Sequence, residues 1–116
     1  MALTRELQIF KDAKVLMTDI DIVVTNMKRE RKFNLGTKMF SIAMEIPELI
    51  GHANRVSGPA RRDTLNKALE KLDHLDFLVN YCQEREYIRM RDSSRIILSL
   101  DKVVKQATGW RNSVRG

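Results

Sequence analysis

The sequence is poor in residues that break helices and in residues that form crosslinks. Two prolines and five glycines among 116 residues are too few for a sandwich or barrel of many short strands. The single cysteine, Cys82, excludes an internal disulfide and a cysteine-based zinc site, and favours a reducing, cytoplasmic setting. No uncharged run exceeds the seven residues from Phe77 to Gln83, and no leader-like apolar stretch opens the chain. We therefore expect neither membrane spanning nor signal-driven export.

The remaining composition indicates a compact, basic domain. Hydrophobic residues make up 43% of the chain, enough for a core, so we expect residues 1–116 to form a single domain. Charged residues make up 31%, which indicates a well-solvated surface around that core. Lysine and arginine exceed aspartate and glutamate by 21 to 15, a net charge of +6 that favours polyanionic partners such as nucleic acid.

Apolar residues recur at helical spacing, beginning with a segment that we expect to be a helix over residues 3–30. Three interleaved seven-residue series run through this segment, a repeat that is typical of helices packed against partner helices. The series are Leu3, Phe10, Met17 and Val24; Ala13, Ile20 and Met27; and Ile9, Leu16 and Val23. Residues 31–34 break the pattern.

The same periodicity predicts three further helices. A second begins at residue 35, and Pro47 inside it is expected to bend the helix without ending it. Residues 57–59, Ser-Gly-Pro, form the clearest turn and lead into a third helix. After a break over residues 85–92 the fourth begins, capped by one of three polar residues, Asp92, Ser93 or Ser94. Four helices joined by short connections predict an all-α, up-down-up-down four-helix bundle.

In that topology the basic residues gather at the two ends of the bundle. One end joins residues 28–38, with a net charge of +4, to residues 85–95, with a net charge of +2. The opposite end also carries +4, so the helix middles are net acidic. Arg61 and Arg62 there fall in the first turn of the third helix, where the helix dipole disfavours cations. This placement is a mild indication of a functional role for the pair, and the alternative is an ordinary solvated helix end.

The first end has the composition of a site for RNA or single-stranded nucleic acid. Arginine and lysine neutralise phosphates, and an adjacent aromatic ring offers a surface on which an unstacked base can lie. The predicted nucleic-acid-binding residues are Lys28, Arg29, Arg31, Lys32, Phe33, Arg85, Tyr87, Arg89 and Arg91. The alternative is an ordinary solvated end, at which basic residues complement the helix dipoles.

Two apolar stripes face away from the predicted core. Phe77 and Tyr81 lie one turn apart beside His74 on the third helix, and Val15 and Ile22 form a similar stripe on the first. Exposed aromatic rings at this spacing favour self-association, and we predict these five residues as an interface. The alternative is that they belong to the core of a wider or tilted bundle.

Neither catalysis nor metal binding is indicated. His52 and His74 each follow a glutamate by four residues, which is typical of a surface ion pair. The sequence lacks the inward glutamate and histidine pattern of a di-iron bundle, and it has no Gly-rich phosphate loop, nucleophile elbow or zinc-protease helix. We expect no catalytic residue, no cofactor and no metal.

Three parts of the sequence resemble a known family. They are residues 31–54, RKFNLGTKMFSIAMEIPELIGHAN; residues 62–78 with their regular leucines; and the closing Thr108, Gly109, Trp110 and Arg111. Together they resemble the accessory variability determinant (Avd) of diversity-generating retroelements, and also the four-helix-bundle proteins encoded in intervening sequences of ribosomal RNA genes. Gly109 and Trp110 favour the Avd family.

The resemblance implies a non-enzymatic accessory protein. Avd proteins assemble as a pentameric barrel and bind the reverse transcriptase and nucleic acid. With the template RNA they support the cDNA synthesis of mutagenic retrohoming. The alternative implied by the second family is a structural or protein-interaction module. This chain departs from the Avd pattern midway along the third helix, where Asp73, His74 and Asp76 replace basic residues. That departure places the expected RNA contacts at the helix ends.

Overall fold

The computed structural model describes residues 2–115, and every regular element in that part of the chain is a helix. This confirms the all-α prediction. The elements are, in chain order, a 3-10 turn η1 (Thr4–Glu6), α1 (Gln8–Thr25), α2 (Arg29–Arg31), a π-helical turn η2 (Lys32–Gly36), α3 (Thr37–Arg55), α4 (Gly58–Glu84) and α5 (Met90–Ser113). The four long helices, α1, α3, α4 and α5, make the described chain a four-helix bundle.

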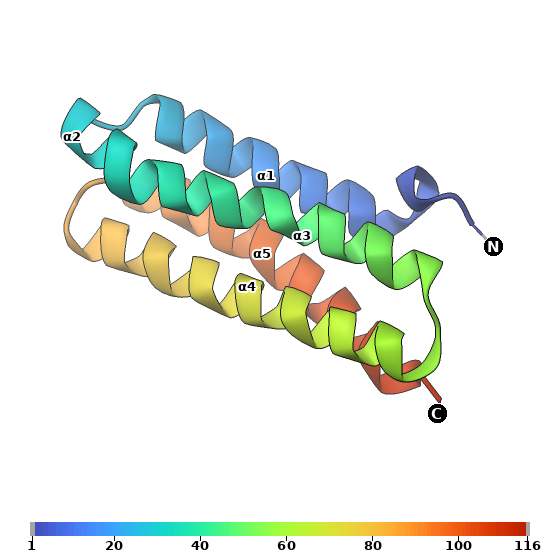
Figure 1. The fold of residues 1–116 in the computed structure, drawn as a ribbon. Helices are drawn as coiled ribbons and strands as arrows, with labels where there is room; N and C mark the ends of the chain where they lie inside the picture. Colours follow the sequence, from blue (N-terminus) through green and yellow to red (C-terminus); the bar gives the residue numbers. More distant parts are fainter. Residues whose placement is uncertain (1, 116) are drawn as a thin grey trace.

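The long helices lie side by side in a rod of 45 × 22 × 21 Å (Figure 1). α3 packs between α1 and α4, and α5 packs between the same two helices on the other side. α1 and α4 therefore lie diagonally across the bundle. The segment from α1 to α3 and the loop from α4 to α5 meet at one end, here called the connection end (Figure 1). The α3–α4 turn and both ends of the described chain lie at the other, the terminal end.

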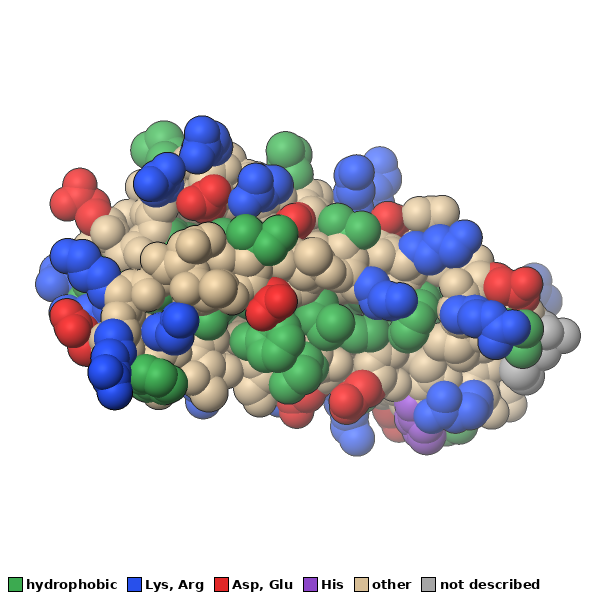
Figure 2. Space-filling view, turned by 90° about the horizontal axis from the view of Figure 1, so that it is seen from above, with side chains coloured by type: hydrophobic (Ala, Val, Ile, Leu, Met, Phe, Trp, Pro, Cys, Tyr) green, Lys and Arg blue, Asp and Glu red, His purple; other side chains and the backbone are tan. Residues whose placement is uncertain are grey.

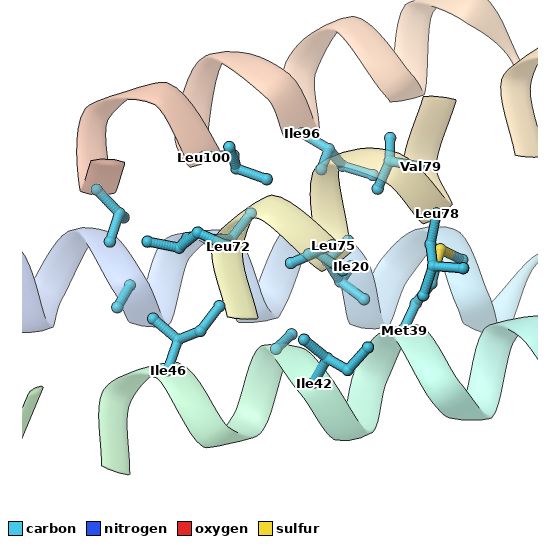
Figure 3. Close-up of a cluster of buried hydrophobic side chains, with 14 of the residues drawn as sticks. Ile20, Met39, Ile42, Ile46, Leu72, Leu75, Leu78, Val79, Ile96 and Leu100 are labelled. Carbon is cyan, nitrogen blue, oxygen red and sulfur yellow. The ribbon is translucent and has the colours of Figure 1, made fainter. Parts of the chain in front are cut away.

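Each long helix buries one apolar stripe in a common core. Ile20 of α1, Ile46 of α3, Leu72 of α4 and Ile96 of α5 are almost completely inaccessible, and their side chains converge between the helices (Figure 3). Two of the three series predicted for the first helix are buried in this core, whereas the series through Phe10 is half-buried or exposed. The core therefore fixes the bundle and leaves the polar helix faces outward.

The first predicted helix, residues 3–30, is wrong at its beginning. Leu7 has an extended backbone, and α1 begins only at the next residue. The segment before it folds toward α3, where the Asn54 side-chain amide donates to the carbonyl of Ala2 (3.0 Å) and to the hydroxyl of Thr4 (3.1 Å). These long-range hydrogen bonds take the place of another helical turn.

The first break also lies earlier than predicted, at residues 26–28 rather than 31–34. The Asn26 side chain donates back to a carbonyl one turn earlier (2.9 Å), a local bond that competes with helix continuation. Residues 31–34 are themselves helical and enter the π-helical turn η2. There the Thr37 hydroxyl donates to the carbonyl of Lys32 (3.0 Å), which satisfies a backbone acceptor of the widened turn.

Gly36, which is buried at the end of η2, allows this connection to lie against α1. A Cβ at this position would be 2.9 Å from Val24 Cγ1 and 3.3 Å from Met27 Sδ. The backbone of Gly36 is helical, so the requirement here is for space and not for a left-handed conformation. The close approach holds the basic connection against the end of the bundle.

The helix continues through the proline as predicted, and the predicted turn at residues 57–59 overlaps the beginning of α4. Pro47 is buried inside α3, which continues through it. Gly58, the first residue of α4, has a positive φ of 57°, which glycine adopts without steric cost. Pro59 follows in the first turn of α4, where its missing N–H costs no helical hydrogen bond.

The predicted cap of the last helix is wrong. α5 begins at Met90, because the chain reverses within residues 85–89. Glu86 adopts a positive φ of 59°, and the Tyr87 N–H donates back to the Cys82 carbonyl (2.8 Å), as at many helix C-termini. The three candidate caps, Asp92, Ser93 and Ser94, therefore lie inside the helix.

Candidate nucleic-acid interface

The two basic segments of the sequence meet at the connection end. One is formed by α2 and η2, and the other is the loop between α4 and α5. Arg31 of the first segment stacks over the Tyr87 ring of the second, with its guanidinium carbon 4.3 Å from the ring centroid. This cation–π contact joins segments that are more than fifty residues apart in the chain.

Tyr87 is an anchor rather than an open stacking surface. Its side chain is half-buried against the hydrophobic core, and Arg85 lies 6.0 Å from the ring centroid in addition to Arg31. The hydrogen bond with the Tyr87 side chain raises the pKa of the Arg85 guanidinium above its ordinary value. A base can stack on Tyr87 only if Arg31 moves away.

Phe33 is the aromatic residue that the connection end leaves open. It is 69% exposed, and Arg29 lies 5.8 Å from its ring centroid. Phe33 belongs to η2, so the π-helical turn presents the ring at the edge of the basic segment. The structure thus separates the two predicted aromatic residues into one that holds the site together and one that is accessible.

A broad depression of about 950 Å³ opens beside these segments, between the end of α1 and the beginning of α5. Lys28, Arg89 and Arg91 line it, all with exposed side chains. Arg95 also lines it, but lies within ion-pair distance of Asp92 (3.2 Å) and Asp19 (4.0 Å). The depression is open and basic, which suits an extended polyanion better than an enclosed small molecule.

The predicted phosphate-binding residues carry charge that the described chain does not neutralise. Within residues 2–115, none of the following has a carboxylate at ion-pair distance: Lys28, Arg29, Arg31, Lys32, Arg85, Arg89 and Arg91. Seen from above, basic side chains lie at this end with some acidic side chains among them, and further basic side chains lie along the rod and at its other end (Figure 2). Arg31 and Lys32 are half-buried, and the other five are exposed.

The arginines at the terminal end stabilise the fold instead. The Arg61 Nε donates to the Ala53 carbonyl near the end of α3 (2.8 Å), and its guanidinium lies 5.3 Å from the Trp110 ring centroid. Arg62 donates to the Val114 carbonyl that follows α5 (3.0 Å). Both satisfy carbonyls at helix C-termini, where cations are favourable. These contacts give the arginine pair a structural role, whereas the sequence provided only a mild indication of a functional one.

The predicted interface residues lie on two different faces of the bundle, and one of them, Ile22, lines the depression at the connection end. Phe77 is 63% exposed on α4, and its ring stacks with that of Tyr81 at a centroid distance of 6.3 Å. His74 is exposed on the same helix. Val15 and Ile22 are exposed on α1, which lies diagonally opposite α4. The two stripes therefore cannot form one continuous patch on a single copy.

The described chain offers few side chains for metal binding or for nucleophilic catalysis. Residues 2–115 contain no cluster of three or more His, Cys, Asp or Glu side chains that would hold a metal ion. His52 and His74 are exposed, as are the glutamates four residues before them. Burial raises the pKa of the Cys82 thiol, so that the reactive thiolate is disfavoured. In the described part of the chain, no helix is both long and apolar enough to cross a membrane.

The sequence reasoning missed one feature of the site, the lining of a groove next to Phe33. Lys38 and Ser41 on α3 face this groove together with His74 on α4. Helical spacing was sufficient to place Lys38 and Ser41 on one face of α3, but the α3–α4 packing was needed to bring His74 opposite them. Comparisons with protein-family models and with curated proteins found no match to this chain.

Proposed function

We propose that this chain is a non-enzymatic, RNA-binding accessory protein of the Avd type, which acts in the cytoplasm as part of a diversity-generating retroelement. It binds the template RNA or its cDNA and the reverse transcriptase, and thereby supports mutagenic retrohoming. The observation that supports RNA binding most directly is the meeting of two basic segments at the connection end, without neutralising carboxylates, beside the exposed Phe33 ring. The retroelement role rests on the family resemblance.

The proposal includes assembly of an up-down-up-down bundle into a homopentameric barrel. A ring with five subunits needs a head-to-tail interface, in which two different surfaces of each copy meet. The exposed stripes on α1 and α4 supply two such surfaces on diagonal faces of the bundle. The number of five comes from the resemblance. Light scattering tests it, because a particle of 13.5 kDa at micromolar concentration would contradict any assembly.

The RNA-binding proposal is tested by removing charge at the connection end. In the test variant, four arginines are changed to alanine: Arg29, Arg31, Arg85 and Arg89. In the control variant, four exposed lysines away from the connection end are changed to alanine: Lys11, near the beginning of α1, and Lys67, Lys102 and Lys105. Both variants lose the same charge, so a difference between them reports location. Affinity for single-stranded RNA is measured by fluorescence anisotropy across a range of salt concentrations.

The test variant should bind weakly, with a flattened salt dependence. Each phosphate that is no longer neutralised lowers the log–log salt slope by about 0.7 for a single strand, so four such phosphates lower it by about 3. The control variant should keep the slope of the unaltered protein. Equal losses of affinity in the two variants, or a salt-independent affinity of the unaltered protein, would show that the connection end is not the binding site.

A structural or protein-interaction module is the second candidate function, and the exposed stripes on α1 and α4 favour it. Such a protein would self-associate or bind a protein partner tightly and would not be retained on RNA. The retroelement role has its own test in the neighbouring reading frames. A reverse transcriptase gene beside a near-duplicate template and variable repeat is expected there, and co-purification of that polymerase with this chain then tests the partnership.

A further inference from the structure

A second depression, of about 390 Å³, lies between α3 and α4 beside the connection end. Phe33 stands at one end of it, α3 contributes one wall and α4 contributes the other. We call it the Phe33 groove and define it by six of its residues: Phe33, Thr37, Lys38, Ser41, Lys71 and His74. The groove is continuous with the basic segment through Phe33, which Arg29 approaches from the turn that precedes η2.

The charges in the groove favour an anion at the Phe33 end. Glu45 is the acid on the α3 wall, and it pairs with Lys71 at 3.3 Å, so these two charges compensate each other. Lys38 is exposed and has no carboxylate at ion-pair distance within residues 2–115. With Arg29 beside the ring, the uncompensated charges next to Phe33 are both positive.

The hydrogen-bonding groups of the groove differ in their availability. The Thr37 hydroxyl is engaged with the Lys32 carbonyl. The Ser41 hydroxyl is exposed and has no hydrogen-bond partner in the described chain, and the His74 side chain is exposed on the opposite wall. The groove therefore offers a flat apolar ring, cations near that ring, and polar groups that are free to contact a bound molecule. An unpaired nucleotide has the matching parts, a base with a π face, polar base edges and a phosphate.

We infer that the Phe33 groove binds one unpaired nucleotide of a single strand, with its base on the Phe33 ring and its phosphate near Lys38 and Arg29. This inference rests on the proposed function and deepens it, because it makes single-stranded nucleic acid the preferred ligand. In a duplex the base faces are stacked on each other and cannot reach the ring, so a duplex gains only the phosphate contacts.

The test separates base stacking from charge. Phe33→Leu removes the ring face but keeps an apolar side chain. The control, Leu98→Ala, shortens an apolar side chain of similar exposure (68%) on α5, outside the groove and outside both predicted interface stripes. Binding of a uridine oligomer and of an RNA duplex is measured for both variants. Phe33→Leu should weaken single-strand binding by about tenfold, the size of one base–aromatic stack. Its salt slope should be unchanged because every phosphate-binding cation is kept.

Three further results are expected. Phe33→Leu should bind the duplex as the unaltered protein does, and Leu98→Ala should bind both ligands normally. Lys38→Gln should lower the single-strand salt slope by about 0.7, the value for one phosphate. In a Phe33→Trp variant the uridine oligomer should quench the emission of the introduced indole, whereas Trp110 at the terminal end gives a constant background. Circular dichroism should show that each variant remains folded.

The outcomes distinguish this inference from the function on which it rests. If the protein binds RNA with steep salt dependence but Phe33→Leu binds the uridine oligomer normally, the nucleotide site is wrong and the RNA-binding proposal stands. Equal losses of affinity for single strand and duplex, or no quenching in Phe33→Trp, would also overturn the site. If the unaltered protein binds no RNA, both are wrong.

Discussion

Replacement of Gly36 by alanine is the sharpest test of how the basic connection is held in place. An alanine Cβ would lie 2.9 Å from Val24 Cγ1, well inside the normal carbon–carbon contact of about 3.5–4.0 Å. It would also lie 3.3 Å from Met27 Sδ. Val24 and Met27 fill the space between η2 and the end of α1, so either η2 or α1 must shift to admit the new Cβ. Overpacking of this kind lowers the free energy of unfolding by about 1–3 kcal/mol.

Helix propensity acts in the opposite direction, because alanine favours a helix more than glycine does. The sign of the change in the free energy of unfolding therefore shows which of the two effects is larger. Glycine to alanine in a helix interior is worth about 1 kcal/mol in favour of alanine when nothing else changes. Gly109 supplies that reference, since it lies in α5 and a Cβ there would meet nothing within 4 Å. We expect Gly109→Ala to stabilise the protein by up to about 1 kcal/mol, and Gly36→Ala to destabilise it by up to about 2 kcal/mol once both effects are combined.

Urea unfolding followed by circular dichroism measures both changes. A double variant, Gly36→Ala with Val24→Ala, removes the nearest methyl group. It should cost less than the two single changes together, because the added Cβ then occupies the vacated space. A Gly36→Ala protein more stable than the unaltered one would refute the reasoning. The tight approach of η2 to α1 would then not be what positions the connection end.

Three other predictions follow from single contacts. Arg61→Gln should cost about 2 kcal/mol in urea unfolding, because it removes the charged hydrogen bond to the Ala53 carbonyl and the cation–π contact with Trp110; an unchanged stability would mean that Arg61 is not structural. Burial holds the pKa of Cys82 above the unfolded value of 9.0. The protonated, buried thiol therefore stabilises the fold fully below pH 9.0, and this stabilisation is lost as the pH rises above that value. In urea unfolding at a series of pH values, Cys82→Ala should not show this loss. Phe77→Ser should weaken self-association in light scattering without lowering helicity, and an unchanged particle mass would exclude the α4 stripe from the interface.

The long helices were predictable because their signal is local. In a buried stripe such as that of α4, an apolar residue recurs every three or four residues, so each helical turn carries the same evidence for a helix. Helix ends depend on distant partners instead. α1 begins late because Asn54, far along the chain, binds the N-terminal segment, and the connection stays helical where Gly36 fits against Val24. Neither partner can be identified from the residues next to these ends.

The candidate site was predictable to a similar degree. Charge counting placed two basic segments at one end of the bundle, and the structure brings them into contact through Arg31 and Tyr87. Charge counting did not distinguish side chains that are accessible to a ligand from side chains that are already in contact with the rest of the protein. Tyr87 and Phe33 have the same sequence context, a ring among basic residues, but only the structure separates the half-buried ring from the exposed one. Likewise, Arg61 has a structural role because a helix carbonyl lies within its reach.

The arrangement of the helices explains why side chains alone determine the field at the connection end. That end holds the C-termini of α1 and α4 and the N-termini of α3 and α5, so the partial charges of the helix dipoles largely cancel there (Figure 1). The attraction for a polyanion thus comes from the unpaired lysines and arginines and should disappear with them. In a ring of copies the same charges would repel one another, and an RNA strand bridging them would relieve that repulsion. RNA binding and assembly should therefore strengthen each other by the same factor, as thermodynamic linkage requires.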